Sequence, residues 1–202
     1  YLIAAIDEMH EKIFQQTESK KLSFILLLFA VTRELLPQTY DVCLVDITYE
    51  ATEIGIVRDG ILTYSTHTSF GSFSLAREIS AIVNVPLHEA FGYLHTEKPY
   101  AFTENLNKIQ KNDIDAVFEA YIQKVSELFT ETGDSLSIPK KISLHTDLHS
   151  ESLFMDLIEK AAKRNLKTSP LITPISNEII KQTYLQSTGE TPQDIPADTA
   201  LL

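Results

Sequence analysis

Apolar residues at helical spacing dominate the start of the chain. Residues 1–18, YLIAAIDEMHEKIFQQTE, place isoleucines and a phenylalanine near that spacing, which predicts an amphipathic helix. Residues 20–36 are apolar nearly all round before Pro37 ends the pattern, so a second helix, buried on several sides, is expected. The apolar run within it, FILLLFAV, is far shorter than the roughly 20 residues needed to cross a bilayer. It is predicted to be core, without membrane insertion.

Three strands are predicted next. Residues 42–47, VCLVDI, form a continuous apolar run that ends beside an acid, which is typical of a central strand covered on both faces. Residues 52–64, TEIGIVRDGILTY, alternate around the dipeptide Asp59-Gly60, a favourable type I′ hairpin turn. The three strands are therefore predicted to form a meander.

Helical patterns alternate with strands over the rest of the chain. Helices are expected at residues 74–83 and 86–94, followed by a polar boundary. A strong apolar face then predicts a helix from Asn112 to Phe129, with Gly133 after its end. The remaining pattern predicts strands at 140–148 and 170–176 and helices at 150–165 and 177–186. The order gives an α/β fold with a mixed sheet and helices on its faces.

Composition and charge exclude several classes of protein. With 44% hydrophobic and 22% charged residues, the chain is predicted to fold. The formal net charge is −11 and lysines and arginines do not cluster, which argues against nucleic acid as a partner. The single cysteine, Cys43, lies in an apolar run and is predicted to be a buried small hydrophobe in a reducing, cytoplasmic compartment.

The element order, with an acid at the first strand tip and a hairpin after it, resembles the second half of the actin-like ATPase (ribonuclease H-like) fold. Within that superfamily the chain looks most like the cell-division protein FtsA and the pilus-assembly protein PilM. The resemblance covers residues 22–176, through LVDITYEATEIGIVRDGIL, SFGSFSLAREISAIVNVPLHEAFGYL and KKISLHTDL. The chain starts without a Met and stops within an apolar run, so a fragment of a longer protein is expected.

The resemblance implies a division of the chain. Residues 1–37 would be a helical lead-in from a missing first half. Residues 38–95 and 136–202 would form the ribonuclease H-like subdomain. Residues 96–135 would form a small inserted subdomain that, in FtsA-like proteins, contributes to self-assembly and to binding a partner's terminal peptide.

The resemblance also implies a phosphate-binding loop at the first hairpin. Asp46 would be the acid on the metal side, Thr52 the hydroxyl facing phosphate, and Glu53 the acid after it. Thr48 stands where the family pattern has the loop glycine, and glycine matters there because a chain without Cβ can approach phosphate oxygens closely. We therefore expect Asp46, Thr48, Thr52 and Glu53 to form a vestigial loop without catalytic residues.

Further departures fall at other glycines of the pattern. Glu50 would add repulsion beside a triphosphate. Gly71 keeps one member of a glycine pair, and LHTDLHS has no glycine where the family has a glycine-rich turn. The resemblance thus implies an FtsA/PilM-type scaffold with lost or weak nucleotide binding, and no cofactor. An active ATPase using ATP and Mg²⁺, with its first-half phosphate loop outside this sequence, is the alternative.

Other candidate sites have plainer explanations. Asp46 could cap the hairpin through backbone N–H groups instead of binding metal. His145 and His149 would suit zinc only in a helix, and that segment is predicted to leave a strand, so no metal site is predicted. A ribonuclease H-like nuclease needs converging carboxylates, and Asp147 is the only other acid near a predicted strand tip.

Overall fold

The computed structural model describes residue 12 and residues 23–131, 138–146, 150–166 and 168–188. Apart from Lys12, the predicted helix at 1–18 lies outside the described residues. So do Gly133, Asp147 and His149.

Five strands form one mixed sheet in the order β3-β2-β1-β4-β5. Strands β1, β2 and β3 form an antiparallel meander, whereas β4 and β5 run parallel to β1. The predicted fold class is confirmed, and β1 is central and buried at every position. The strands are β1 Val42–Ile47, β2 Thr52–Arg58, β3 Ile61–Thr68, β4 Lys141–Thr146 and β5 Leu171–Pro174.

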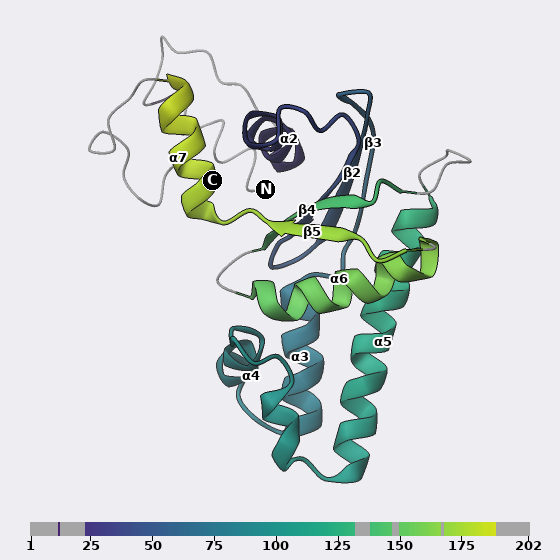
Figure 1. Cartoon of the computed structure of the whole chain (residues 1–202). Helices are drawn as coiled ribbons and strands as arrows, with labels where there is room; N and C mark the ends of the chain where they lie inside the picture. The colour runs from purple at the N-terminus through teal and green to yellow at the C-terminus, as the bar shows by residue number, and fades with distance from the viewer. Residues whose placement is uncertain (1–11, 13–22, 132–137, 147–149, 167, 189–202) are drawn as a thin grey trace.

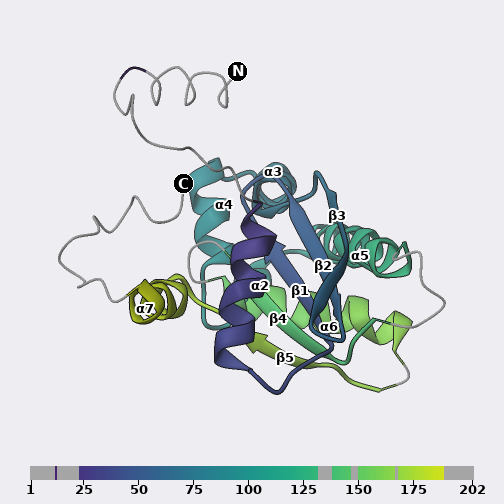
Figure 2. The same ribbon diagram turned by 90° about the horizontal axis from the view of Figure 1, so that it is seen from above.

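Helices cover both faces of the sheet unequally (Figure 1). One face carries α3 Ser72–Val83, α4 Leu87–Leu94, the 3-10 helix η1 Ala101–Asn105, α5 Lys108–Thr130 and α6 Glu151–Asn165. The other face carries α2 Phe24–Leu35, which crosses over the strands in Figure 2, and α7 Asn177–Thr188. No helix in the described part of the chain is long and apolar enough to cross a membrane.

Strand alternation divides the core into two clusters. Side chains of successive residues point to opposite faces, so Cys43 and Val45 join the larger core with α3, α5 and α6. Val42 and Leu44 join the smaller core with α2 and α7. Burial raises the pKa of the Cys43 thiol to about 12, consistent with its prediction as a buried hydrophobe.

Three local predictions can be compared with the structure. Asp59 and Gly60 have φ values of 49° and 74°, which confirms the type I′ turn. The helix predicted from Asn112 begins earlier, at Lys108, because Asn107 and Gln110 form a capping box. The expectation that the second helix is buried on several sides is wrong.

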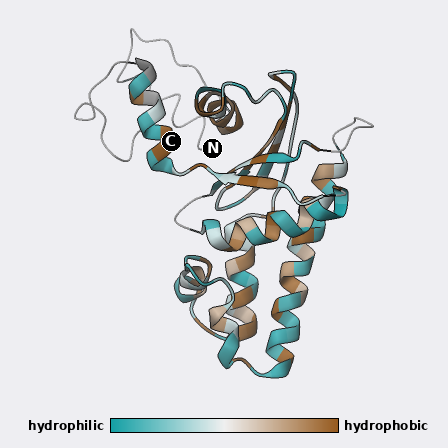
Figure 3. Ribbon diagram, in the orientation of Figure 1, coloured by the Kyte–Doolittle hydropathy of each residue, from teal (hydrophilic) through white to brown (hydrophobic). Residues whose placement is uncertain are grey.

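Helix α2 buries only one face because it lies in an outer layer of the molecule. Ile25, Leu28 and Val31 are buried, while Leu26 and Leu35 are 39% and 41% exposed. Figure 3 shows that α2 is nonetheless apolar along most of its length. Apolar composition therefore overestimated how many layers cover this helix.

Candidate functional site

The turn between β1 and β2 is closed by Thr48. The Thr48 N–H donates to the Ala51 carbonyl at 2.9 Å, and the Ala51 N–H donates to Thr48 Oγ1 at 3.1 Å. The residue in the place of the family's loop glycine thus uses both its backbone and its side chain to hold the turn. Asp46, the alternative candidate for capping the hairpin, instead places its Oδ1 beside Nδ1 of His145.

The same turn is seated on the N-terminus of α3. The N–H groups of Ser72 and Phe73 donate to the carbonyls of Thr48 and Tyr49 at 3.0 and 2.9 Å. Gly71 makes this approach possible, because a Cβ at Gly71 would lie 2.4 Å from the Thr48 carbonyl oxygen. Free N–H groups at a helix N-terminus bind anions. Here two of them are used by the chain itself.

Aromatic rings hold the turn from outside. The Tyr49 ring stacks on Phe73 with centroids 4.9 Å apart and on Phe91 with centroids 5.4 Å apart. Tyr49 stays 46% exposed, and Glu50 beside it is exposed. The tip of the predicted phosphate loop thus presents an aromatic ring and a carboxylate.

Thr52 turns its hydroxyl into the larger core. Its Oγ1 donates to the Phe70 carbonyl at 2.8 Å and lies 2.9 Å from the Tyr121 hydroxyl. Burial raises the pKa of the Tyr121 phenol, so this phenol stays protonated and can donate to Thr52. The predicted hydroxyl facing phosphate is fully buried in this arrangement.

Asp46 faces the α2 and α7 side of the sheet and pairs with His145 of β4. The Nδ1 of His145 lies 2.6 Å from Asp46 Oδ1, and both side chains are almost completely buried. The other ring nitrogen, Nε2, lies 2.8 Å from Oδ1 of Asn177 at the start of α7. The Phe24 ring of α2 packs on the imidazole with centroids 4.7 Å apart. His145 of β4 therefore contacts β1, α2 and α7, and both of its ring nitrogens are engaged.

Two further titratable residues extend this pair across the sheet. Glu53 is the register partner of Asp46, and His67 is the register partner of Glu53. Cross-strand partners project from the same face, so His67, Glu53, Asp46 and His145 form one row across four strands, here called the polar row. Burial, and then the charge of Asp46, raises the pKa of Glu53.

The polar row contains two acids and two histidines, but its described residues do not form a metal centre. Among the residues that the structure describes, no group of three or more histidine, cysteine or acidic side chains could hold a metal ion. One carboxylate oxygen, Asp46 Oδ2, is buried without a hydrogen-bond partner there. The row thus gives Asp46 Oδ1 a partner in His145 and leaves Oδ2 without a hydrogen bond from the described residues.

The sequence identified Asp46 as the strand-tip acid but missed its partners. The sequence spacing pairs His145 only with His149, which lies outside the described residues, and it does not mark Asn177. One signal was present, because carboxyl ends of parallel strands share an edge and His145 lies near the end of the predicted strand at 140–148. The roles predicted for Asp46, Thr48, Thr52 and Glu53 in a vestigial loop stay predictions.

Comparison with known proteins supplies structural likeness only. No protein-family model matches the sequence, and no curated protein matches it. The ethanolamine utilization protein EutJ from Carboxydothermus hydrogenoformans matches with a TM-score of 0.50 and 17% identity, over 78% of this chain and 52% of EutJ. A chain of the PilM-PilN type IV pilus biogenesis complex matches with a TM-score of 0.51 and 14% identity, over 73% and 40%.

An archaeal actin homolog matches with a TM-score of 0.50 and 12% identity, over 83% of this chain and 55% of the homolog. The chain thus spans about half the length of these structures. At such identities the likeness shows the fold alone.

Proposed function

We propose that this chain, which has the actin-like ATPase fold, is a scaffold domain of the FtsA/PilM type. It acts by protein-protein contact, including self-association, in a membrane-associated cell-division or type IV pilus assembly machine. It works in the cytoplasm at the inner face of the membrane, and its nucleotide binding is lost or weak. The observation that carries the proposal is the closed turn at residues 48–51.

A phosphate-binding loop must present free N–H groups to an anion. Around this turn the N–H groups of Ala51, Ser72 and Phe73 already donate within the chain. The exposed carboxylate of Glu50 would repel a triphosphate. The residues present therefore do not fit a phosphate site in this arrangement, and the proposal includes no hydrolytic step.

Support for a protein partner comes from a structural neighbour. The PilM-like neighbour is recorded in a PilM-PilN complex, so this fold does form a complex with a second protein there. The proposed partner of the present chain is a peptide segment of a division or pilus component.

A specific observation also favours the alternative function. Asp46 Oδ2 is buried and accepts no hydrogen bond in the described part of the chain, which leaves one oxygen for a metal ion. In an active actin-like ATPase, Asp46 and Thr52 would serve nucleotide together with a first-half loop outside this sequence. Thr52 would first have to leave its bonds to Phe70 and Tyr121.

Isothermal titration of Mg-ATP into the full-length protein separates the two functions. The scaffold proposal expects no saturable heat up to millimolar ATP, because the turn offers no anion site. Micromolar binding with hydrolysis would overturn it. In that case the Asp46→Asn variant should lose Mg²⁺-dependent binding, while a matched Asp115→Asn change on the exposed surface of α5 should leave binding unchanged.

A further inference from the structure

The two edges of the sheet differ in how well they are protected. Edge strands carry unpaired N–H and C=O groups that can pair with another chain, and proteins blunt them with short length, proline or charge. Strand β5 has four residues and ends at Pro174, which has no N–H to donate. Strand β3 has eight residues, ILTYSTHT, with no proline, lysine, arginine or acid. Only β5 therefore carries obvious protection.

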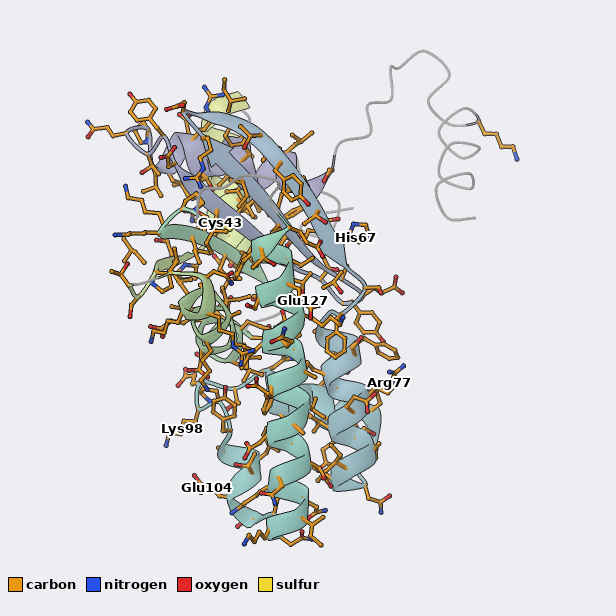
Figure 4. All side chains as sticks on the ribbon, turned by 90° about the vertical axis from the view of Figure 1, so that its right-hand side faces the viewer. Cys43, His67, Arg77, Lys98, Glu104 and Glu127 are labelled. Atoms are coloured by element: carbon orange, nitrogen blue, oxygen red, sulfur yellow. The ribbon has the colours of Figure 1, made fainter. Side chains whose placement is uncertain are left out.

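The outer part of β3 is also regular and accessible. An irregularity in its pairing with β2 lies between Ile56 and Val57, close to the hairpin turn. Beyond it, residues 64–68 pair with β2 in unbroken register. Ser65 and His67 are exposed, and Figure 4 shows His67 at the border of the sheet.

We propose that β3 is an interface at which two copies of this chain pair edge to edge, antiparallel, across a two-fold axis. In such a pair, each copy places the same strand against itself. Two chains of net charge −11 repel each other, so the contact must avoid acidic side chains. Strand β3 meets this condition because it carries none.

The side chains of β3 suit pairing with themselves. Half of the eight residues are threonine or serine, namely Thr63, Ser65, Thr66 and Thr68, and cross-strand threonine and serine pairs stabilise antiparallel sheets. The inference rests on the proposed scaffold function, since it names the surface for the self-association included there. Its experiments use no nucleotide, so each proposal can fail without the other.

Cysteine crosslinking tests the pairing directly. The native Cys43 is fully buried and gives a low background. Ser65→Cys and His67→Cys should be compared under a mild oxidant, with Asn105→Cys as the control. Asn105 follows Glu104, which lies at the end of the helices away from the sheet in Figure 4. A disulfide needs Cα atoms about 4.4–6.8 Å apart, so only positions near the two-fold axis should crosslink. Equal crosslinking at Asn105 would contradict the pairing.

A charge-swap experiment tests the same contact without crosslinking. Sedimentation velocity of the native chain should show a dimer at about 100 μM, and Ser65→Lys or Ser65→Glu alone should weaken it about tenfold or more, because like charges then face each other. An equimolar mixture of the two variants should restore the dimer. Asn105→Lys should have no effect.

Three results would overturn the inference. They are a native chain that stays monomeric at that concentration, a dimer that both Ser65 variants leave intact, and variants whose mixture stays monomeric. Circular dichroism identical to that of the native chain ensures that weakened pairing is not caused by unfolding.

Discussion

The two faces of the sheet carry different kinds of interior. The face under α3, α5 and α6 is a large apolar core in which Thr52 and Tyr121 satisfy each other. The face under α2 and α7 has a smaller apolar cluster and also carries the polar row. Strand β1 supplies both faces, since Val45 points into the first and Asp46 into the second.

The difference shows that one strand can supply apolar side chains to one face of the sheet and an acidic side chain to the other. Apolar burial stabilises the first face in proportion to its area. A buried polar pair such as Asp46–His145 contributes little net stability, yet removing one partner is expensive because the other polar group stays buried without its hydrogen bond. Replacing a single polar residue should therefore lower the free energy of unfolding most on the α2 and α7 face.

The largest effect is expected for His145→Leu, which leaves the Asp46 carboxylate buried without its partner. We expect a loss of about 3–5 kcal/mol in the free energy of unfolding, measured by urea denaturation. The double variant Asp46→Asn, His145→Leu should lose less than the sum of the two single changes. A loss below about 1 kcal/mol for His145→Leu would mean that the pair is not buried in solution.

A matched pair of leucines compares the apolar parts of the two faces. Leu75 of α3 and Leu28 of α2 are both fully buried. Each change to alanine should cost about 2–5 kcal/mol, with Leu75→Ala nearer the upper limit because the larger core can collapse less around the cavity. If urea denaturation shows equal losses in the free energy of unfolding for Leu75→Ala and Leu28→Ala, the two cores do not differ in their capacity to collapse around a cavity.

Local sequence patterns were sufficient for most of the fold. The apolar run of β1 and the Asp59-Gly60 turn act through neighbouring residues, so the central strand and the hairpin could be predicted. The early start of α5 also had a local signal, the capping box of Asn107 and Gln110, which the apolar pattern from Asn112 hid. The exposure of α2 had no such signal, because composition does not state how many layers cover a helix.

The candidate site depends on contacts that are distant in sequence. Asp46 could be identified as a strand-tip acid, but His145 is 99 residues away, and its position follows only from the parallel pairing of β1 and β4. The burial of the Thr52 hydroxyl likewise depends on Tyr121, 69 residues away. Residue types predicted which side chains could bind a ligand, whereas strand register determined which side chains contact one another.

The smallest effect is expected for Glu53→Gln, at a half-buried position inside the polar row. Burial and the Asp46 charge raise the pKa of Glu53 above 4.5, while His67 opposes them. The folded state thus holds a proton that the unfolded state has already released, so stability falls as pH rises from about 4.5 through the raised pKa. Glutamine removes this loss. At pH 7 the variant should be more stable than the native chain by less than about 1 kcal/mol, because solvent screens Glu53, and the gain should vanish below pH 4.

The exposed Glu104→Gln control should change the free energy of unfolding by less than about 0.5 kcal/mol at either pH. If Glu53→Gln instead destabilises the chain at pH 7, the Glu53 carboxylate is held by a favourable partner and the two acids of the polar row do not repel.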